Sequence, residues 1–181
     1  MENANLSFIS AVLNLKPSTA RVCLPPGANC FLTNLDYYLC SKNCINLMVS
    51  SKQSTPVFLN IEEAEAHRRA GAGISKFSST DKGHNPDVVL RGIGAELTFQ
   101  AVKAAELPKE VTPALRVRVF NVTDLMVLSL DSSHPHSFNS QVFNALFTAD
   151  CPIHFNYHGY RNELAALLFG RPQIDRVTIE T

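Results

Sequence analysis

The spacing of apolar residues constrains the fold of this chain more than any other feature. Short runs rich in β-branched residues alternate with longer segments in which apolar side chains recur at helical spacing. That alternation is typical of a parallel sheet whose strands are joined by helices, which is an α/β fold. From about Asp87 onward it is regular enough to predict a doubly wound, mostly parallel sheet.

The first part of the chain predicts one β–α–β unit. Strands are expected at 20–26 and 44–50, the second of them buried, with a helix over 28–42 and a right-handed connection. A helix at 61–71 follows, because acidic residues occupy its first turn, basic residues its last, and a glycine ends it. The polar, Gly-rich stretch 70–86 predicts a linker or an irregular entry into a second module.

Strands and helices then alternate to the end of the chain. Helices are expected at 95–107, 139–147 and 162–170, and strands at 87–93, 115–122, 151–158 and 175–181. The chain starts abruptly on an apolar segment and stops on a strand with no covering helix. Both ends are therefore expected to be cuts through larger structures.

Composition excludes several classes of protein. Hydrophobic residues make up 45% of the chain and charged residues 18%, which favours a globular protein with a sizeable core. The formal net charge of zero provides no long-range field for nucleic acid or an anionic membrane. No apolar run reaches the roughly 18 residues of a membrane span, and the N-terminus lacks the basic region of a signal peptide. A cytoplasmic protein is expected.

The five cysteines predict reduced thiols, most of them in the core. They are odd in number, lie mostly in apolar segments and lack the Cys-x2-Cys pairs of a zinc site: Cys23, Cys30, Cys40, Cys44 and Cys151. The sequon Asn121–Thr123 is then expected to stay unmodified, since glycosylation requires secretion.

Two motifs in the second half suggest ligands, but each has a simpler explanation. Gly92 and Gly94 lie between a strand and a helix, where a dinucleotide fold has its phosphate turn, yet the third glycine is missing and turn geometry alone explains the pair. His154, Asn156 and His158 alternate on one strand face. Two imidazoles can bind a metal, but polar residues facing a crevice are favoured because no further ligand is nearby.

The segment SSHPHS, residues 132–137, places two histidines before a predicted helix. His136 or Ser137 is expected to contribute to capping that helix. A Ser–His nucleophile pair is the alternative, without an assignable acidic partner.

Lys52 follows directly after a predicted strand. Open α/β sheets bind ligands outside the carboxyl ends of their strands, and Ser50, Ser51 and Gln53 beside the lysine are hydrogen-bond donors. An ammonium group among such donors suits a phosphate or sugar phosphate. An idle surface lysine is the alternative.

Several linked segments, in order, resemble the C-terminal third of a phosphoketolase of the xylulose 5-phosphate/fructose 6-phosphate type, and fungal members most. The similarity runs from about Ser7 to the end and is carried by LPPGANCFL, INLMVSSKQSTP, VRVFNVTDLM, SSHPHSFNSQVFNALFT, PIHFNYHGY and LLFGRPQIDRVTIE.

The resemblance implies a fold and a reaction. Residues 1–60 would be the incomplete tail of the pyrimidine-binding α/β domain, and 61–181 the C-terminal domain, transketolase-like and incomplete at its end. The parent would be a homodimeric or larger aldehyde-lyase that uses thiamine diphosphate and Mg2+. It would cleave xylulose 5-phosphate or fructose 6-phosphate with inorganic phosphate, giving acetyl phosphate and an aldose phosphate.

Departures from the family pattern limit what carries over. Relatives have two active-site histidines just before the segment that matches 7–15, whereas Asn3 stands at the second position and the first has no counterpart. Gly27 replaces a usual acidic residue, Ser50–Ser51 replace a Gly-rich turn, and the family's continuation after Thr181 is absent.

Lys52 alone matches a functional residue of the family, the lysine that contacts the substrate phosphate. No catalytic, cofactor or metal residue carries over, so neither thiamine diphosphate nor Mg2+ is expected to bind this chain alone. An inactive fragment is expected. The alternatives are a regulatory module that binds a nucleotide or metabolite near Gly92–Glu96 and His158, or a docking domain for full-length subunits.

Overall fold

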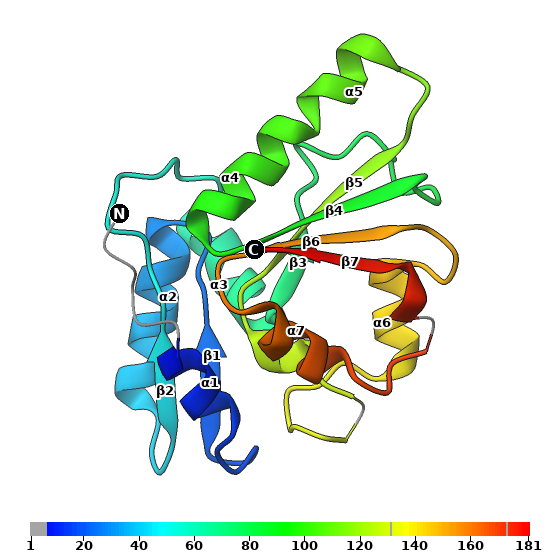
Figure 1. The fold of residues 1–181 in the computed structure, drawn as a ribbon. Coiled ribbons are helices and arrows are strands. Elements are labelled where there is room, and N and C mark those ends of the chain that lie inside the picture. The colour runs from blue at the N-terminus through cyan, green and yellow to red at the C-terminus, as the bar shows by residue number, and fades with distance from the viewer. Residues whose placement is uncertain (1–6, 131, 173) are drawn as a thin grey trace.

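The structure is a computed structural model that describes residues 7–130, 132–172 and 174–181 (Figure 1). Asn3, which bears on the resemblance, lies outside the described residues. The described chain contains a two-stranded parallel sheet and a five-stranded sheet. No helix within these ranges is long and apolar enough to cross a membrane.

The N-terminal unit is the predicted β–α–β arrangement, preceded by a helix that the apolar pattern did not reveal. Its elements are α1 (Ser7–Leu13), β1 (Ala20–Cys23), α2 (Ala28–Cys40) and β2 (Ile45–Met48). β1 and β2 pair in parallel, with Ala20 opposite Ile45. β1 is fully buried, but the prediction that the second strand is buried is wrong: β2 is half-exposed, because it forms the edge of a two-stranded sheet.

The predicted helix at 61–71 is confirmed as α3 (Ile61–Ala70). The Asn60 side chain accepts from the Glu63 amide, Glu63 accepts from the Asn60 amide, and Gly71 ends the helix in the left-handed conformation. The prediction of a linker after α3 is wrong at its start, because β3 (Ala72–Ile74) pairs antiparallel with a later strand.

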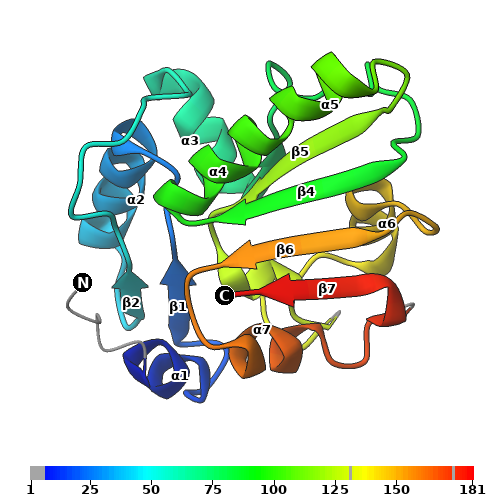
Figure 2. The same ribbon diagram turned by 45° about the horizontal axis from the view of Figure 1, so that its top comes forward.

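The five-stranded sheet confirms the doubly wound prediction. Its elements are β4 (Val88–Ile93), α4 (Ala95–Ala104), α5 (Glu106–Val111), β5 (Val117–Val122), the 3-10 turn η1 (Leu125–Leu128), α6 (Ser140–Phe147), β6 (Ile153–Tyr157), α7 (Arg161–Leu168), the 3-10 turn η2 (Ile174–Arg176) and β7 (Val177–Glu180). The strand order is β3-β5-β4-β6-β7, and only β3 is antiparallel. Helices α4 and α5 lie on one face of the sheet, and α6 and α7 on the other (Figure 2).

The two sheets share one apolar core. Ile9, Val22 and Leu24 from the N-terminal unit belong to the same buried cluster as Val122 and Leu125 from the second. The backbone also joins them, since the Leu24 amide donates to the Thr123 carbonyl at 2.7 Å. This junction fixes the carboxyl ends of β1 and β2 relative to the larger sheet.

Candidate functional site

The carboxyl ends of β1 and β2 lie next to the start of α4. Between them is a cavity of about 340 Å3, here called the strand-end cavity, which is lined by Pro25, Gly27, Ala28, Phe31, Ser50, Ser51, Gln53, Ser54, Thr55 and Ala95. Strands β4, β6 and β7 also point their carboxyl ends toward the N-terminal unit (Figure 2). This is the edge at which open α/β sheets bind ligands.

Local hydrogen bonds shape the loop that borders this cavity. The Val49 amide donates to the Cys23 carbonyl at 2.9 Å, which extends the pairing of β2 with β1 by one residue. The Ser51 hydroxyl then accepts from the Gln53 amide at 2.9 Å and lies 3.0 Å from the Gln53 carbonyl. A serine turn of this kind reverses the chain tightly. Lys52, between Ser51 and Gln53, is therefore held at the tip of the turn.

Lys52 itself is exposed and is not among the residues that line the strand-end cavity, although both of its neighbours are. Its ammonium group makes no hydrogen bond or ion pair with any described residue. The structure therefore brings Ser50, Ser51 and Gln53 together at a cavity, and Lys52 lies at its rim without a partner among the described residues.

The lining of the strand-end cavity suits a small anion. Hydroxyl groups come from Ser50, Ser51, Ser54 and Thr55. The first residues of α2 and α4, Ala28 and Ala95, bring the unpaired amides and the positive dipole ends of two helices to the same cavity. No acidic residue is among the lining residues, so nothing there repels a phosphate.

Two residues of the lining, Thr55 and Ala95, were not predicted for this site, although Thr55 lies in the same segment as Lys52 and Ala95 directly follows Gly94. Each is a common residue type that carries no chemical signal of its own. Their positions alone could have indicated the site. Thr55 follows β2 and Ala95 follows β4, and the carboxyl ends of strands come together at one edge of a parallel fold.

Gly92 and Gly94 are explained by packing. A Cβ atom on Gly92 would overlap the backbone of Thr98 in α4, and Gly94 has φ of 96°. Gly92 therefore permits the close approach of α4 to β4, and Gly94 supplies a turn that other residues rarely adopt. These roles favour turn geometry over a dinucleotide site.

Substituting Gly92 with alanine is expected to destabilise the fold by about 3 kcal/mol, because a backbone neighbour cannot move aside as a side chain can. Chemical denaturation followed by circular dichroism measures the loss. Gly83→Ala is the matched control: Gly83 has φ of 82° but open space around it, so only the backbone cost of about 1–2 kcal/mol applies. Equal losses at the two glycines would contradict this explanation.

The prediction that His154 and Asn156 share one face of a strand is confirmed for β6. His154 and Asn156 lie on the less buried face, while Phe155 and Tyr157 are buried. The His154 ring lies 3.1 Å from the Thr178 hydroxyl, and Asn156 bonds to Gln100. Within the described ranges, no group of three His, Cys, Asp or Glu side chains is placed to hold a metal ion.

The capping prediction for His136 or Ser137 is wrong. Asn139 caps α6, because its side chain accepts from the Val142 amide at 2.8 Å. The Ser137 hydroxyl instead accepts from the backbone amide of His134 at 3.0 Å. The His134 ring is buried and contacts the Ala20 carbonyl at 3.0 Å, so this loop fastens the two sheets together.

All five cysteines are free thiols, and Cys23, Cys30 and Cys151 are buried as expected, whereas Cys40 and Cys44 are exposed. Burial raises the pKa of Cys23 and of Cys30 to about 12. Neither thiol is therefore ionised near neutral pH, which excludes both as ready nucleophiles.

Comparisons with known proteins identify the family that the chain matches. Residues 52–181 match the family described as XFP C-terminal domain. A probable phosphoketolase of Schizosaccharomyces pombe is 57% identical over 173 residues, which is 96% of this chain and 21% of that protein. A probable phosphoketolase of Rhodopseudomonas palustris is 46% identical over 153 residues, or 84% of this chain and 19% of that protein.

Among solved structures, the transketolase from Leishmania mexicana superimposes with a TM-score of 0.57 at 17% identity, over 85% of this chain and 20% of that one. At this identity the match shows the fold alone. The chain thus spans about a fifth of the length of the curated relatives it matches.

Proposed function

Because the chain belongs to the phosphoketolase family, we propose that it is the C-terminal part of an enzyme that cleaves xylulose 5-phosphate or fructose 6-phosphate with inorganic phosphate. The products of the parent reaction are acetyl phosphate and a shorter aldose phosphate. The matched relatives carry phosphoketolase in their names, which supports a role in carbohydrate metabolism.

In this proposal the chain contributes a phosphate contact through Lys52. The observation that carries it is the strand-end cavity: hydroxyl groups and two helix N-termini converge beside the exposed lysine, and no acidic residue lines the cavity. An ammonium group with rotatable bonds can reach over the rim to a phosphate seated among these donors. Lys52 therefore orients the substrate and neutralises its charge, without taking part in bond cleavage.

The residues described here do not fit the cofactor that the family implies. Mg2+ requires oxygen ligands, usually including one or two carboxylates. The described lining of the strand-end cavity contains no carboxylate. We propose that thiamine diphosphate and Mg2+ are held by other parts of the parent, at the interface of a homodimer or larger assembly. The isolated chain would then be inactive, since the cofactor supplies the chemistry.

The proposed phosphate contact predicts a weak but specific affinity of this chain for inorganic phosphate. A site that is open on one side rarely binds its ligand tightly, so a dissociation constant on the order of millimolar is expected for phosphate. Lys52→Ala should weaken it about five-fold, because one charge-assisted contact is lost. Phosphate titrations followed by NMR measure both values.

Lys42→Ala is the matched control, since Lys42 is also exposed and lies at the opposite end of β2. Its phosphate affinity should equal that of the parent chain. If the two alanine variants behave alike, Lys52 has no specific role. Titration with ATP in the same assay tests the alternative of a nucleotide-binding module, which predicts tighter binding of ATP than of phosphate.

A further inference from the structure

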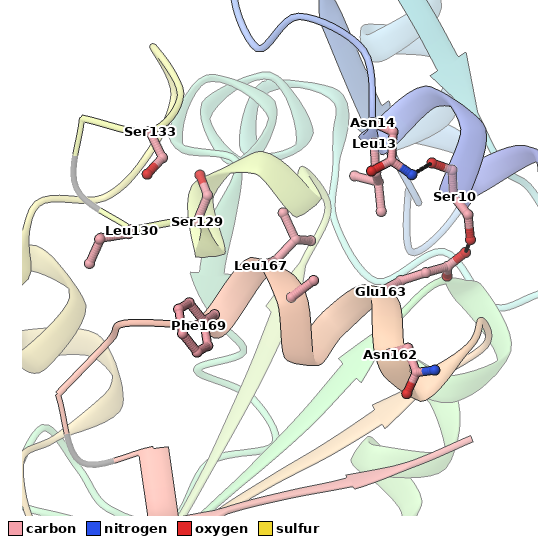
Figure 3. Close-up of a pocket in the computed structure, with 11 residues that line it drawn as sticks. Ser10, Leu13, Asn14, Ser129, Leu130, Ser133, Asn162, Glu163, Leu167 and Phe169 are labelled. Carbon is pink, nitrogen blue, oxygen red and sulfur yellow. Dashed lines mark hydrogen bonds between the residues drawn. The ribbon is translucent and has the colours of Figure 1, made fainter.

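A second pocket lies on the side of the molecule where α1 meets α7 (Figure 3). It has a volume of about 490 Å3 and is here called the α1–α7 pocket; its lining residues are Ser10, Leu13, Asn14, Ser129, Leu130, Ser133, Asn162, Glu163, Ala166, Leu167 and Phe169. It shares no lining residue with the strand-end cavity. Its size suits a small molecule.

Among the described lining residues, Glu163 is the only ionisable one, and its side chain is largely buried. Its carboxylate accepts hydrogen bonds from the Ser10 hydroxyl, from the Tyr157 hydroxyl at 2.7 Å and from the Tyr160 amide at 3.1 Å. All three donors are neutral, and no described lysine, arginine or histidine pairs with this carboxylate. A cation in the pocket would therefore gain from its charge.

Burial, together with the hydrogen bond to Glu163, raises the pKa of Tyr157 above its ordinary value. The phenol thus keeps its proton and remains the donor to Glu163. This arrangement holds Glu163 in place: Oε2 accepts from both Tyr157 and Tyr160, and Oε1 accepts from Ser10 and keeps one lone pair available.

Three polar side chains of the pocket each have a hydrogen committed to a neighbour and present an acceptor, whereas Ser133 and Asn162 can both donate and accept. The Ser10 hydroxyl donates to Glu163, and the Ser129 hydroxyl donates to the Met126 carbonyl at 2.6 Å. The Asn14 amide nitrogen donates to the Ser10 carbonyl at 2.8 Å, which leaves its oxygen unpaired among the described residues. A ligand rich in donors complements such a surface, whereas a phosphate or carboxylate does not.

Apolar groups complete the pocket. Leu13, Ala166 and Leu167 provide a hydrocarbon wall, and the ring of Phe169, which is 81% exposed, stands beside them. Figure 3 shows Glu163 toward one end of α7, beside Ser10, and Phe169 at the other end, on the side of Leu130 and Ser129. An exposed phenyl face attracts ammonium groups.

We propose that the α1–α7 pocket binds a small organic diammonium compound, with one ammonium toward Glu163 and Asn14, its hydrocarbon chain against Leu167 and its other ammonium toward the ring of Phe169. The site is separate from the proposed phosphate contact and independent of it.

The test uses the whole chain and three probes of different charge: 1,4-diaminobutane, erythritol and inorganic phosphate. Two-dimensional NMR titrations at constant ionic strength are expected to show saturable shifts for the diamine at Ser10, Asn14 and Asn162. Erythritol should bind more weakly, and phosphate should leave these signals unmoved.

Phe169→Ala is expected to weaken diamine binding about two- to five-fold, as the loss of one cation–π contact implies. Phe77→Ala is the control, because Phe77 is 56% exposed and lies outside the pocket. Glu163→Gln should weaken binding at least ten-fold and, unlike Phe169→Ala, should remove the preference for the diamine over erythritol. If Glu163→Gln does not fold, the comparison of Phe169→Ala with Phe77→Ala decides.

Three outcomes would overturn the proposal: no saturable diamine binding, shifts that map elsewhere on the chain, or equal affinities for the Phe169→Ala and Phe77→Ala variants. Tighter binding of erythritol than of the diamine would also overturn it, since that result assigns the pocket to neutral polyols.

Discussion

Replacing Arg91 with methionine is expected to stabilise the protein by about 3 kcal/mol, although the substitution removes a fully buried residue at the centre of the sheet. The guanidinium group lies over the rings of Phe147 and Phe155, at 4.1 and 4.4 Å from their centroids. None of its three nitrogen atoms has a hydrogen-bond partner among the described residues. A buried charge in this state costs more than its two ring contacts return.

The pKa of Arg91 reports the same cost. Burial, and to a lesser extent the nearby charge of Arg176, holds the pKa of Arg91 well below the ordinary arginine value. The folded state therefore disfavours the protonated guanidinium, which the unfolded chain retains. Arg91 thus lowers the free energy of unfolding at every pH at which the unfolded arginine is charged, which includes neutral pH. Methionine fills a similar volume without the charge, and thermal melting should show an increase of roughly 6–12 °C.

Arg118→Met is the matched control, because Arg118 is also buried and lies on the adjacent strand, with Val89 opposite it. Arg118 donates to Asp81 at 2.7 Å and to the His84 carbonyl at 3.0 Å. Without Arg118, the buried carboxylate of Asp81 would lose its partner of opposite charge, so a destabilisation of about 3–5 kcal/mol is expected. A lower melting temperature for both variants would show that Arg91 is stabilised by contacts that the geometry does not reveal.

Asp124→Ala is expected to destabilise the protein by about 3–5 kcal/mol and to loosen the junction of the two sheets. Asp124 is fully buried and accepts from Arg21 of β1 at 2.8 Å and from the Met126 amide at 3.0 Å. Without the carboxylate, the Arg21 guanidinium stays buried with no opposite charge. Urea denaturation measures the loss, and hydrogen exchange should show β1 losing protection first.

Asp87→Ala is the comparison variant for Asp124, since the ion pair of Asp87 with Arg116 is solvent-exposed on both sides. Surface pairs of this kind contribute little, so its urea midpoint should stay close to that of the parent chain. A similar loss in the two variants, or intact exchange protection of β1 in Asp124→Ala, would contradict the role given to the buried pair.

Most of the sheet could be predicted from the sequence because its central strands are largely buried and its helices are amphipathic. β5, for example, is buried at every position, and a buried run rich in β-branched residues favours a strand. The elements that escaped prediction are short. α1 has seven residues and β3 has three, too few for a period to stand out. β3 exists because β5 offers it an edge, a tertiary effect that local sequence does not encode.

The candidate site was predictable in location but not in composition. Lys52 could be placed at a strand end from the order of elements, because parallel strands expose their carboxyl ends at one edge. The lining of the strand-end cavity depends on how α4 of the second sheet meets the N-terminal unit, which places Ala95 beside Ser50. The buried pair of Arg21 and Asp124, which holds that junction, is 103 residues apart in sequence and had no local signal.

The most direct test of the proposed function is an assay of the purified chain for acetyl phosphate. Xylulose 5-phosphate, inorganic phosphate, thiamine diphosphate and Mg2+ are supplied together, and a purified phosphoketolase serves as the positive control. The proposal that this chain provides a phosphate contact but no cofactor site predicts weak phosphate binding and no acetyl phosphate above background. Enzyme-dependent formation of acetyl phosphate that is lost in Lys52→Ala would contradict it.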